Sequence, residues 1–312
     1  MNYGAFLSSV GTLFLLLAAG FIAGKLRIID DVSTKKLSVL IVKIGQPFLL
    51  ISSLISLEYT PENLKTGLFT LLLSLGLHIF MGGAAFLFSK TIRNLSLRSI
   101  GEFALIFTNC GFIGFPIIYG LYGDKGLFCG AFYLVGFHLF LWTWGIFVLS
   151  RGRRDIKPTV KNIFINFGTI PSLIGIVFFL LPFRLPDAVI SFSKYLSGLC
   201  TPISMLITGA LIASLKPKRL FGNVYAYVVC FFKLAVIPMI TACVLKLIGI
   251  DPFFTVFGTV MAALPSASVV TMFSELYSLD SGWSSQLVGL TTLFSVGTLP
   301  LIVLFAQFIS SV

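Results

Sequence analysis

Two membrane-length apolar stretches of this chain are interrupted by the residue types that a spanning helix tolerates least. The first contains the run Asn109-Cys-Gly-Phe-Ile-Gly-Phe-Pro116, and the second contains the run Leu264-Pro-Ser-Ala-Ser268. A proline has no N–H, and its ring displaces the carbonyl four residues back, so the carbonyls of Phe112 and Met261 should lose their helical partners. Because broken helices persist in a membrane only where they are buried in protein or line a polar cavity, the interruptions predict a polar intramembrane site.

The chemistry available at the interruptions is that of a small ion-binding site. Unpaired N–H groups at the start of a half-helix suit a carboxylate or another anion, whereas freed carbonyls suit a cation. The amide of Asn109 adds a donor and an acceptor at the same depth. We therefore expect residues of both interruptions to bind substrate: Asn109, Gly111, Gly114, Pro116, Pro265, Ser266 and Ser268. The alternative is a pair of simple proline kinks whose freed groups are satisfied by neighbouring helices.

A few ionisable or strongly polar residues also lie inside the apolar segments and are candidates for function. Lys43 and Lys233 could hold an anionic substrate, with Gln46 close to the first, or they could snorkel or pair with Glu102. Glu102 lies four residues after an arginine, so the alternative to proton coupling is an i,i+4 ion pair. His138 could titrate in a coupled cycle or could be a packing residue.

The elements that must position these residues are membrane-spanning helices. Of the 312 residues, 57% are hydrophobic and only 11% are charged, whereas soluble domains carry about 25% charged residues. Eight uncharged runs are long enough to cross a membrane, and segments 32–57 and 219–247 also span if one lysine in each is accepted. The predicted fold class is therefore an all-α integral membrane protein with ten transmembrane helices.

The positive charges indicate orientation. If the N-terminus lies outside, the cytoplasmic connections hold 15 Lys and Arg residues and the outer connections hold 5. The positive-inside rule then predicts a multi-pass protein of the cell (inner) membrane with both termini outside. The net charge of +11 is accordingly an orientation signal that contacts the lipid bilayer, and no nucleic acid is expected as a partner.

The basic stretch that begins at Arg151 divides the chain into two halves, residues 1–155 and 156–312, with five helices each. An odd number of helices makes the halves run through the membrane in opposite senses. Acids, lysines and prolines recur in a similar order in both halves, and the interruptions then occupy equivalent places in helices 4 and 9. Paired broken helices in inverted repeats are typical of secondary transporters.

The same two runs carry a family resemblance. The run from Asn109 to Pro116, followed by Leu121-Tyr-Gly123, resembles the fourth-helix signature of the auxin efflux carrier family. The run Ala263-Leu-Pro-Ser-Ala267, followed by Glu275-Leu-Tyr277, resembles that family's ninth-helix signature. The resemblance implies two inverted five-helix repeats with helices 4 and 9 broken and crossing at their prolines.

Further properties are implied by the resemblance alone. It implies a scaffold of helices 1, 2, 6 and 7, often forming a homodimer, and a transport bundle of helices 3–5 and 8–10 that moves like an elevator. It implies small organic acids as substrates: auxin in plant members, and malate- or malonate-like dicarboxylates in bacterial ones. Plant carriers place an asparagine at both crossings, whereas serines stand beside Pro265 here. This departure and the short central connection favour a bacterial-type carrier.

The sequence therefore predicts a secondary carrier of a small organic anion, such as a carboxylate, a dicarboxylate or an auxin-like acid, coupled to a proton or a sodium ion. We expect no enzyme activity, no metal and no cofactor, because the sequence has no HExxH, no mid-helix aspartyl pair and no Walker A pattern. The alternatives are a sodium-coupled bile-acid-type symporter, which shares the crossed helices, and a channel or non-transporting sensor of the same fold. The scarcity of mid-membrane acids disfavours sodium.

Overall fold

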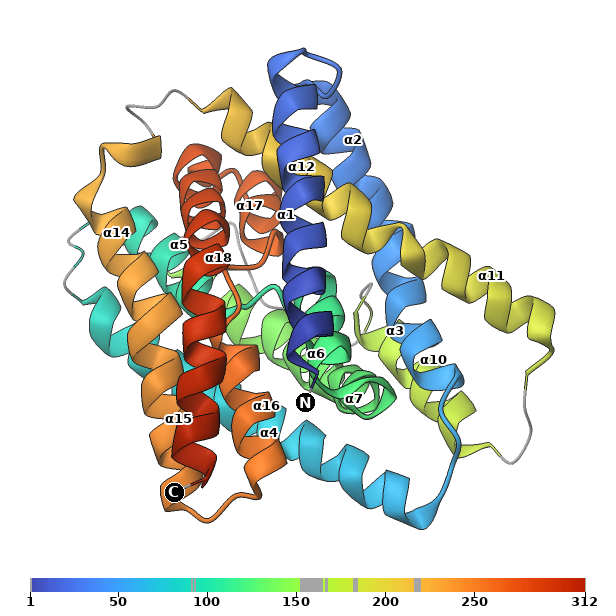
Figure 1. Ribbon diagram of the computed structural model, residues 1–312. Helices are drawn as coiled ribbons and strands as arrows, with labels where there is room; N and C mark the ends of the chain where they lie inside the picture. The colour runs from blue at the N-terminus through green and yellow to red at the C-terminus, as the bar shows by residue number, and fades with distance from the viewer. Residues whose placement is uncertain are drawn as a thin grey trace.

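The computed structural model of the protein describes residues 2–90, 92, 94–151, 165, 168–181, 185–215 and 220–311. Every named element in these residues is a helix, so the predicted all-α class is confirmed (Figure 1). Seven helical segments are long and apolar enough to cross a membrane, judged by length and composition: Tyr3–Lys25, Asp31–Ile55, Pro61–Ser89, Asp124–Ser150, Asp187–Ser214, Val224–Leu247 and Ser281–Ser311.

Three of these segments are single α-helices, and four consist of consecutive helical pieces. The single helices are α1 (Tyr3–Lys25), α4 (Pro61–Ser89) and α18 (Ser281–Ser311). The composite segments are α2 (Asp31–Leu40), η1 (Ile41–Gly45) and α3 (Gln46–Ile55); α7 (Asp124–Phe140), η3 (Leu141–Gly145) and α8 (Ile146–Ser150); α11 (Asp187–Gly198) and α12 (Cys200–Ser214); and α14 (Val224–Phe231), η4 (Phe232–Val236) and α15 (Ile237–Leu247). Each η element is one turn of π-helix.

Three π turns directly precede a helix that has a proline at its second position. These prolines are Pro47 after η1, Pro238 after η4, and Pro116 after η2 (Cys110–Gly114). Because the proline ring would collide with the carbonyl four residues back, widening the preceding turn from α to π makes room for it. The extra residue also rotates the side chains around the helix axis, which alters the faces that a regular helix would present.

The two interrupted segments are indeed broken. The first consists of α5 (Leu95–Ile106), η2 and α6 (Phe115–Tyr122), and the second consists of α16 (Pro252–Ala263) and α17 (Val269–Leu276). The first break covers residues 107–109 and so begins before the predicted run. The reason is that the π turn η2 accommodates Pro116, so the helix is continuous from Cys110 to Tyr122 and the interruption lies before it. The second break covers residues 264–268, as predicted.

The arrangement of ten spans as two inverted repeats stays a prediction. The shorter apolar helices are Cys110–Tyr122, Pro252–Ala263 and α10 (Thr169–Leu180). Several basic residues that indicate orientation lie outside the described residues: Arg93, Arg153, Arg154, Lys157, Lys161, Arg184, Lys216, Lys218 and Arg219. The location of the termini and the choice of membrane therefore also stay predictions.

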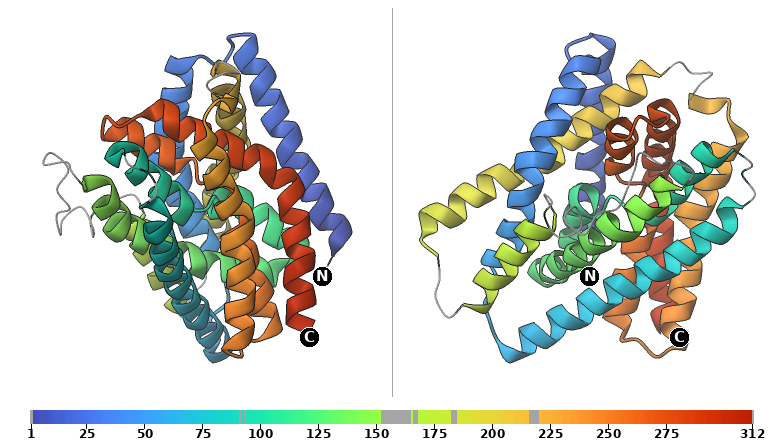
Figure 2. Two further views of the ribbon diagram at one scale, coloured as in Figure 1. Left: turned by 90° about the vertical axis from the view of Figure 1, so that its left-hand side faces the viewer. Right: turned by 180° about the vertical axis from the view of Figure 1, so that it is seen from behind.

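The helices can be divided into two groups by their contacts, although α1 also packs against α6 and α3 against α7. One group contains α1, α2, α3, α10, α11 and α12, and the other contains α4–α8 and α14–α18. The right-hand view of Figure 2 shows the blue and yellow helices of the first group on the left and the orange and red helices of the second on the right. Within the first group α1 and α12 touch through glycines, because a Cβ on Gly209 would lie 2.1 Å from the carbonyl oxygen of Leu17. Close backbone contact through small residues is typical of helix pairs in membranes.

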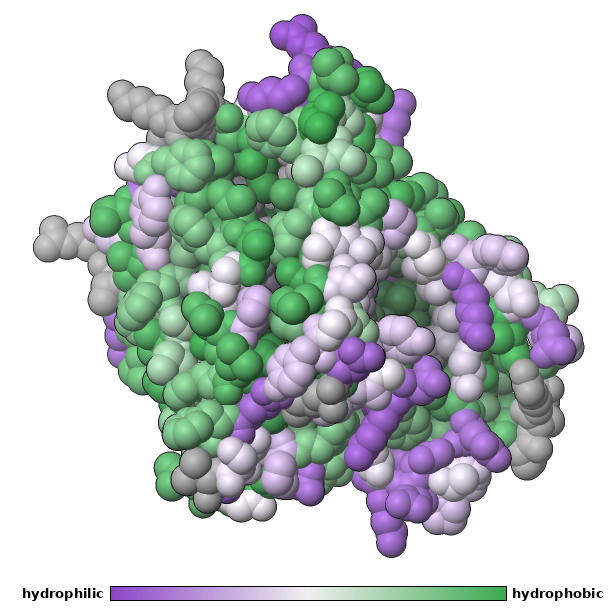
Figure 3. All heavy atoms as spheres, in the orientation of Figure 1, coloured by the Kyte–Doolittle hydropathy of each residue, from purple (hydrophilic) through white to green (hydrophobic). Residues whose placement is uncertain are grey.

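The outer surface suits a lipid environment. Large apolar side chains are exposed on helices throughout the chain, among them Leu15, Leu72, Tyr195 and Leu301. Figure 3 shows hydrophobic residues over most of the left part of one face, with hydrophilic residues gathered at the top and along the lower rim. Contiguous exposed apolar surface of this extent is uncommon in soluble monomers and is expected of a protein surrounded by lipid.

Candidate functional site

The two breaks meet in the interior and pair through their backbones. The N–H of Asn109 donates to the carbonyl oxygen of Pro265 at 2.8 Å, and the N–H of Ala267 donates to the carbonyl oxygen of Phe107 at 2.9 Å. The intervening residues of the two segments form an isolated antiparallel bridge. A break frees polar backbone groups that cannot be left unpaired away from water, and this short bridge pairs several of them. The predicted meeting of the interruptions is confirmed.

Side chains satisfy the carbonyls at the end of α5. The hydroxyl of Ser266 donates to the carbonyl oxygen of Ala104 at 2.9 Å, and Nζ of Lys233 donates to that of Leu105 at 2.7 Å. Both side chains are completely buried. The C-terminal end of a half-helix carries partial negative charge, so an ammonium group there is favourably placed.

These bonds differ from the substrate contacts that the sequence predicts for Ser266 and Lys233. Neither residue lines the cavity beside the crossing. The physical reason is that the last carbonyls of α5 have no intrahelical donors. They therefore accept hydrogen bonds from the nearest buried hydroxyl and amino groups. Both residues therefore stabilise the crossing.

A small cavity lies directly beside the crossing. Its polar lining comes from both breaks and from the first group of helices, and its walls are otherwise apolar, with Leu134, Phe137 and Met272 among them. The polar lining residues are Gln46, Thr108, Asn109, Cys110, Gly111 and Ser268. The cavity has a volume of about 20 Å³, which is room for a single water molecule. An adjoining cavity shares Ser268 and Met272 and extends toward Glu275.

Asn109 is the polar centre of this cavity. Its side chain is only 3% exposed, and Nδ2 has no hydrogen-bond partner among the described residues. A buried donor without an acceptor costs about 1–3 kcal/mol, so an acceptor atom of a ligand would be stabilised there. The backbone beside it belongs to the first turn of η2, where the N–H of Cys110 donates to the carbonyl oxygen of Thr108 at 2.8 Å. The side chain of Asn109 therefore supplies an unpartnered donor at this point of the cavity.

Gln46 connects the cavity to a buried histidine. Nε2 of Gln46 and Nε2 of His138 are 3.1 Å apart, and the imidazole is 1% exposed. Gln46 belongs to α3 and lines the cavity, whereas His138 belongs to α7. The structure thus brings together two residues that the sequence nominated separately, and one of them, Gln46, lines the cavity of Asn109. A role of His138 in proton coupling stays a prediction.

Other nominated residues do not line this cavity. Lys43 lies in η1, and its side chain is exposed on the surface of the molecule. Because the helix is widened there, the side chains of Lys43 and Gln46 point in different directions. Gly114 packs at the crossing, where a Cβ would lie 2.9 Å from the side chain of Leu264. Pro116 begins α6. The structure does not bring these three residues to the lining of this cavity, and their contacts with substrate stay predictions.

The ion pair of Glu102 also differs from the predicted one. Its carboxylate pairs with Arg151 at 2.7 Å and accepts from the hydroxyl of Ser89 at 3.1 Å. Arg98, the arginine four residues earlier, instead donates from Nε to the hydroxyl of Ser89 at 3.2 Å. Glu102 is completely buried, and Arg151 is the cation that pairs with its charge. A role of Glu102 in proton coupling stays a prediction.

Sequence reasoning missed the hydroxyl groups that surround Ser268. The Oγ atom of Ser268 lies 3.4 Å from that of Ser204 and 3.5 Å from Oγ1 of Thr208, both on α12. Thr201 on the same helix donates to the carbonyl oxygen of Phe112 at 3.2 Å, the carbonyl that Pro116 deprives of a helical donor. The only available signal was the spacing of hydroxyl residues along an apolar segment, which is common in buried helices generally.

Comparison with known proteins identifies the family. A family model described as membrane transport protein matches residues 5–303. The chain belongs to this family. It is the family of the auxin efflux carriers, so the resemblance carried by the two interruptions is confirmed. The membership makes this chain a multi-pass membrane transporter of a family that is not an enzyme family.

Two archaeal relatives match along almost their whole length. An uncharacterized transporter of Methanocaldococcus jannaschii is 28% identical over 295 residues, which cover 90% of this chain and 92% of the relative. An uncharacterized transporter of Methanothermobacter thermautotrophicus is 22% identical over 299 residues, which cover 94% of this chain and 96% of the relative. The similarity of this membrane transporter to both relatives therefore covers at least 90% of its chain.

Proposed function

We propose that this membrane transport protein is a secondary carrier that binds a small organic anion, a mono- or dicarboxylate, at the crossing of its broken helices. The observation that carries the proposal is the unpartnered Nδ2 of Asn109 in the cavity. A carboxylate oxygen is an acceptor that satisfies such a donor, and a hydrogen bond to a charged group contributes about 1.5–3 kcal/mol.

The direction of the half-helices supports an anion over a cation. The cavity is lined by Gly111 at the start of η2 and by Ser268 and Val269 at the start of α17. Two helix N-termini, each with partial positive charge, therefore face the same space. The opposite end of one broken helix, that of α5, is already bound by Lys233 and Ser266.

Lys233 also bears on the coupling ion. Its ammonium group occupies the place at the end of α5 where freed carbonyls would otherwise suit a cation. A sodium ion needs several oxygen ligands, and the carbonyls of Ala104 and Leu105 are already hydrogen-bonded. We infer that Lys233 is a tethered cation and that the carrier does not use sodium at this place. The occupied carbonyls disfavour the bile-acid-type alternative, and His138, through Gln46, is then the proton-sensitive group.

The size of the cavity supports alternating access. About 20 Å³ holds one water molecule, so a carboxylate enters only when the walls separate. Gln46 and Leu49 belong to the first group of helices, whereas Asn109 and Ser268 belong to the second. Sliding of the second group against the first, in the manner of an elevator, would open the cavity along this boundary. A homodimer formed through the first group would hold that group still.

The test is uptake by purified protein in liposomes, measured for a panel of mono- and dicarboxylates with and without imposed proton and sodium gradients. We expect saturable uptake of at least one carboxylate without sodium dependence. Asn109→Ala should lower uptake about tenfold or more, since it removes a hydrogen bond to a charged group.

The control is Asn63→Ala, which removes an amide that bonds the carbonyl oxygen of Glu58 on the exposed surface. It should leave uptake unchanged. Ohmic single-channel currents would instead support the channel alternative, and binding without any flux would support a sensor. Uptake by Asn109→Ala equal to that of the wild type would contradict the assignment of the site.

A further inference from the structure

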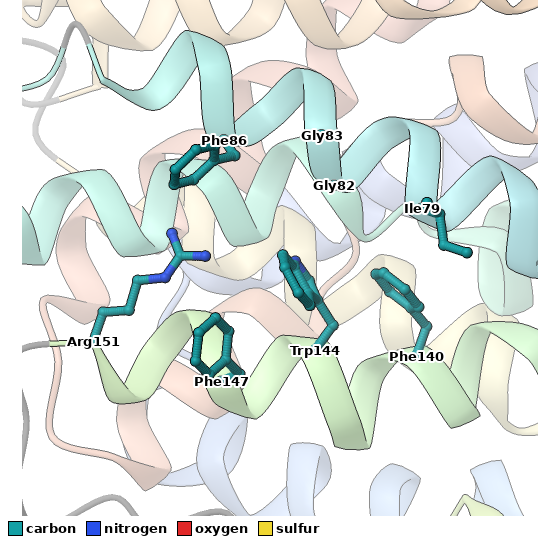
Figure 4. A pocket seen from close by; sticks show the side chains of 8 residues that line it. All are labelled: Ile79, Gly82, Gly83, Phe86, Phe140, Trp144, Phe147 and Arg151. Carbon is teal, nitrogen blue, oxygen red and sulfur yellow. The ribbon is translucent and has the colours of Figure 1, made fainter.

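A second, larger cavity lies on the outer surface between α4 and the segment formed by α7, η3 and α8 (Figure 4). It shares no lining residue with the cavity beside the crossing. It is a groove of about 510 Å³. Its walls are almost wholly apolar, with Phe86 on one side and Phe140, Trp144 and Phe147 on the other, and Arg151 lies at one end. The carrier function described above uses none of these residues.

The groove follows from the spacing of side chains on two helices that run in the same direction. Phe140, Trp144, Phe147 and Arg151 are four, three and four residues apart, so they lie along one face of their segment. On the facing helix, Gly82 and Gly83 have no side chains to fill the space, and a Cβ on Gly83 would meet no atom within 4 Å. The glycines of α4 thus leave the space of the groove open, and the aromatic rings of the facing segment line it.

The length of the groove matches one leaflet of a bilayer. From residue 140 to residue 151 a helix rises about 16 Å at 1.5 Å per residue. Half of a hydrocarbon core is about 15 Å. One acyl chain can therefore lie along the groove from the middle of the membrane to its surface.

Positive charge gathers at one end of the groove. Three cations surround the ring of Phe86: Nζ of Lys90 at 4.7 Å, Cζ of Arg151 at 5.3 Å and Cζ of Arg98 at 5.8 Å from its centroid. Glu102 pairs with Arg151, which leaves two positive charges in excess within this cluster. Basic clusters beside a spanning helix attract anionic lipid headgroups.

An unpartnered donor lies inside the groove as well. Nε1 of Trp144 is buried and has no hydrogen-bond partner among the described residues, and it faces Gly82, whose Cβ would lie 3.4 Å away. Indole N–H groups find a partner when buried. Trp144 lies near the deep end of the groove, seven residues before Arg151, so its indole is next to the acyl chain and makes no headgroup contact.

We propose that this groove binds an anionic phospholipid, with one acyl chain between α4 and α7–α8 and the phosphate at Lys90, Arg98 and Arg151. The positive-inside prediction assigns this end to the cytoplasmic leaflet. The occupant combines the two features of the site: a chain one leaflet long and a negative headgroup. A zwitterionic lipid satisfies the first feature only.

The experiment uses Trp144 as the probe, in the full chain with Trp142→Phe and Trp283→Phe, reconstituted in lipid nanodiscs. Phosphatidylglycerol or phosphatidylcholine with brominated chains is added at equal low mole fraction, and quenching of Trp144 is measured. We expect stronger quenching by phosphatidylglycerol. Lys90→Gln with Arg98→Gln should remove that preference, with a loss of roughly fivefold per basic residue, as about 1 kcal/mol each implies.

A second variant tests the groove itself. Gly83→Leu fills open space and should abolish the quenching preference without a clash. Gly76→Leu is the matched control: it is on the same helix, it also meets open space, and it does not line the groove. Equal quenching by the two lipids in the otherwise unchanged protein, or an undiminished preference in Gly83→Leu, would overturn the proposal. Native mass spectrometry of the unmodified protein, with phosphatidylglycerol retained over phosphatidylcholine, checks that the tryptophan replacements did not create the result.

Discussion

The two broken helices of this transporter differ in how completely the polar groups at their breaks are paired. At the second break, the hydroxyl of Ser266 is fully used by the carbonyl of Ala104, and its N–H donates to Thr291 at 3.1 Å. At the first break the backbone is equally well paired, but the side chain of Asn109 keeps a donor without a partner. The comparison teaches that a break by itself is structural. Only the polar group left unsatisfied in a cavity indicates binding.

The two ends of the first broken helix differ in the same sense. The end of α5 is a set of acceptors that Lys233 and Ser266 bind, while the start of η2 lines the cavity beside the unpartnered donor of Asn109. Under the proposed function, this contrast favours an anion at the crossing. Three predictions follow this contrast from the largest effect to the smallest.

Lys233→Met should have the largest effect. It leaves the carbonyl of Leu105 without its donor and the end of α5 without a compensating charge, and an unsatisfied buried acceptor costs about 1–3 kcal/mol. We expect uptake in liposomes to fall about tenfold and the midpoint of thermal unfolding to fall as well. Lys246→Met is the control, because that lysine is exposed on the same segment. Normal uptake and normal thermal stability in Lys233→Met would show that the end of α5 needs no cation.

The pair Ser266→Ala and Ser268→Ala separates structure from binding within one break. Ser266→Ala should lower the thermal stability, since a buried carbonyl loses its donor, and should leave the KM for substrate unchanged. Ser268→Ala should raise KM about threefold through a lost hydrogen bond and should leave stability unchanged. The measurements are thermal unfolding in detergent and uptake kinetics. A raised KM in Ser266→Ala together with a lowered thermal stability in Ser268→Ala would contradict these assignments.

His138→Gln should have the smallest effect. Glutamine keeps a hydrogen-bonding group beside Gln46 but cannot take up a proton at neutral pH. We expect uptake driven by a proton gradient to lose its dependence on that gradient, while exchange of labelled for unlabelled substrate continues at the wild-type rate. Measuring both modes in the same liposomes provides the internal control. An unchanged gradient dependence would exclude His138 from coupling.

The sequence predicts much of this molecule because its strongest signals are local. Pro265 and the apolar runs around it define a break that the structure contains, and Asn109 stands out as a polar residue within a spanning segment. Such signals depend on covalent geometry and on the solvent, both of which can be read along the chain.

What could not be predicted depends on which groups meet in three dimensions. Lys233 looked like a substrate ligand, yet it bonds a carbonyl 128 residues away in the chain. Lys43 and Gln46 are three residues apart. Because a π turn lies between them, the side chain of Lys43 is on the surface and that of Gln46 lines the cavity. Glu102 pairs with Arg151, 49 residues away, in place of the arginine one turn back. Spacing along the chain does not specify these partners.

The central claim is that Asn109 donates to a carboxylate in the cavity. The most direct measurement is isothermal titration of the best carboxylate from the uptake panel into wild-type protein, Asn109→Ala and Ser266→Ala at matched folded fraction. The account predicts that Asn109→Ala raises Kd about tenfold or more, while Ser266→Ala leaves Kd unchanged in the folded protein. Equal affinity in Asn109→Ala and the wild type would contradict it.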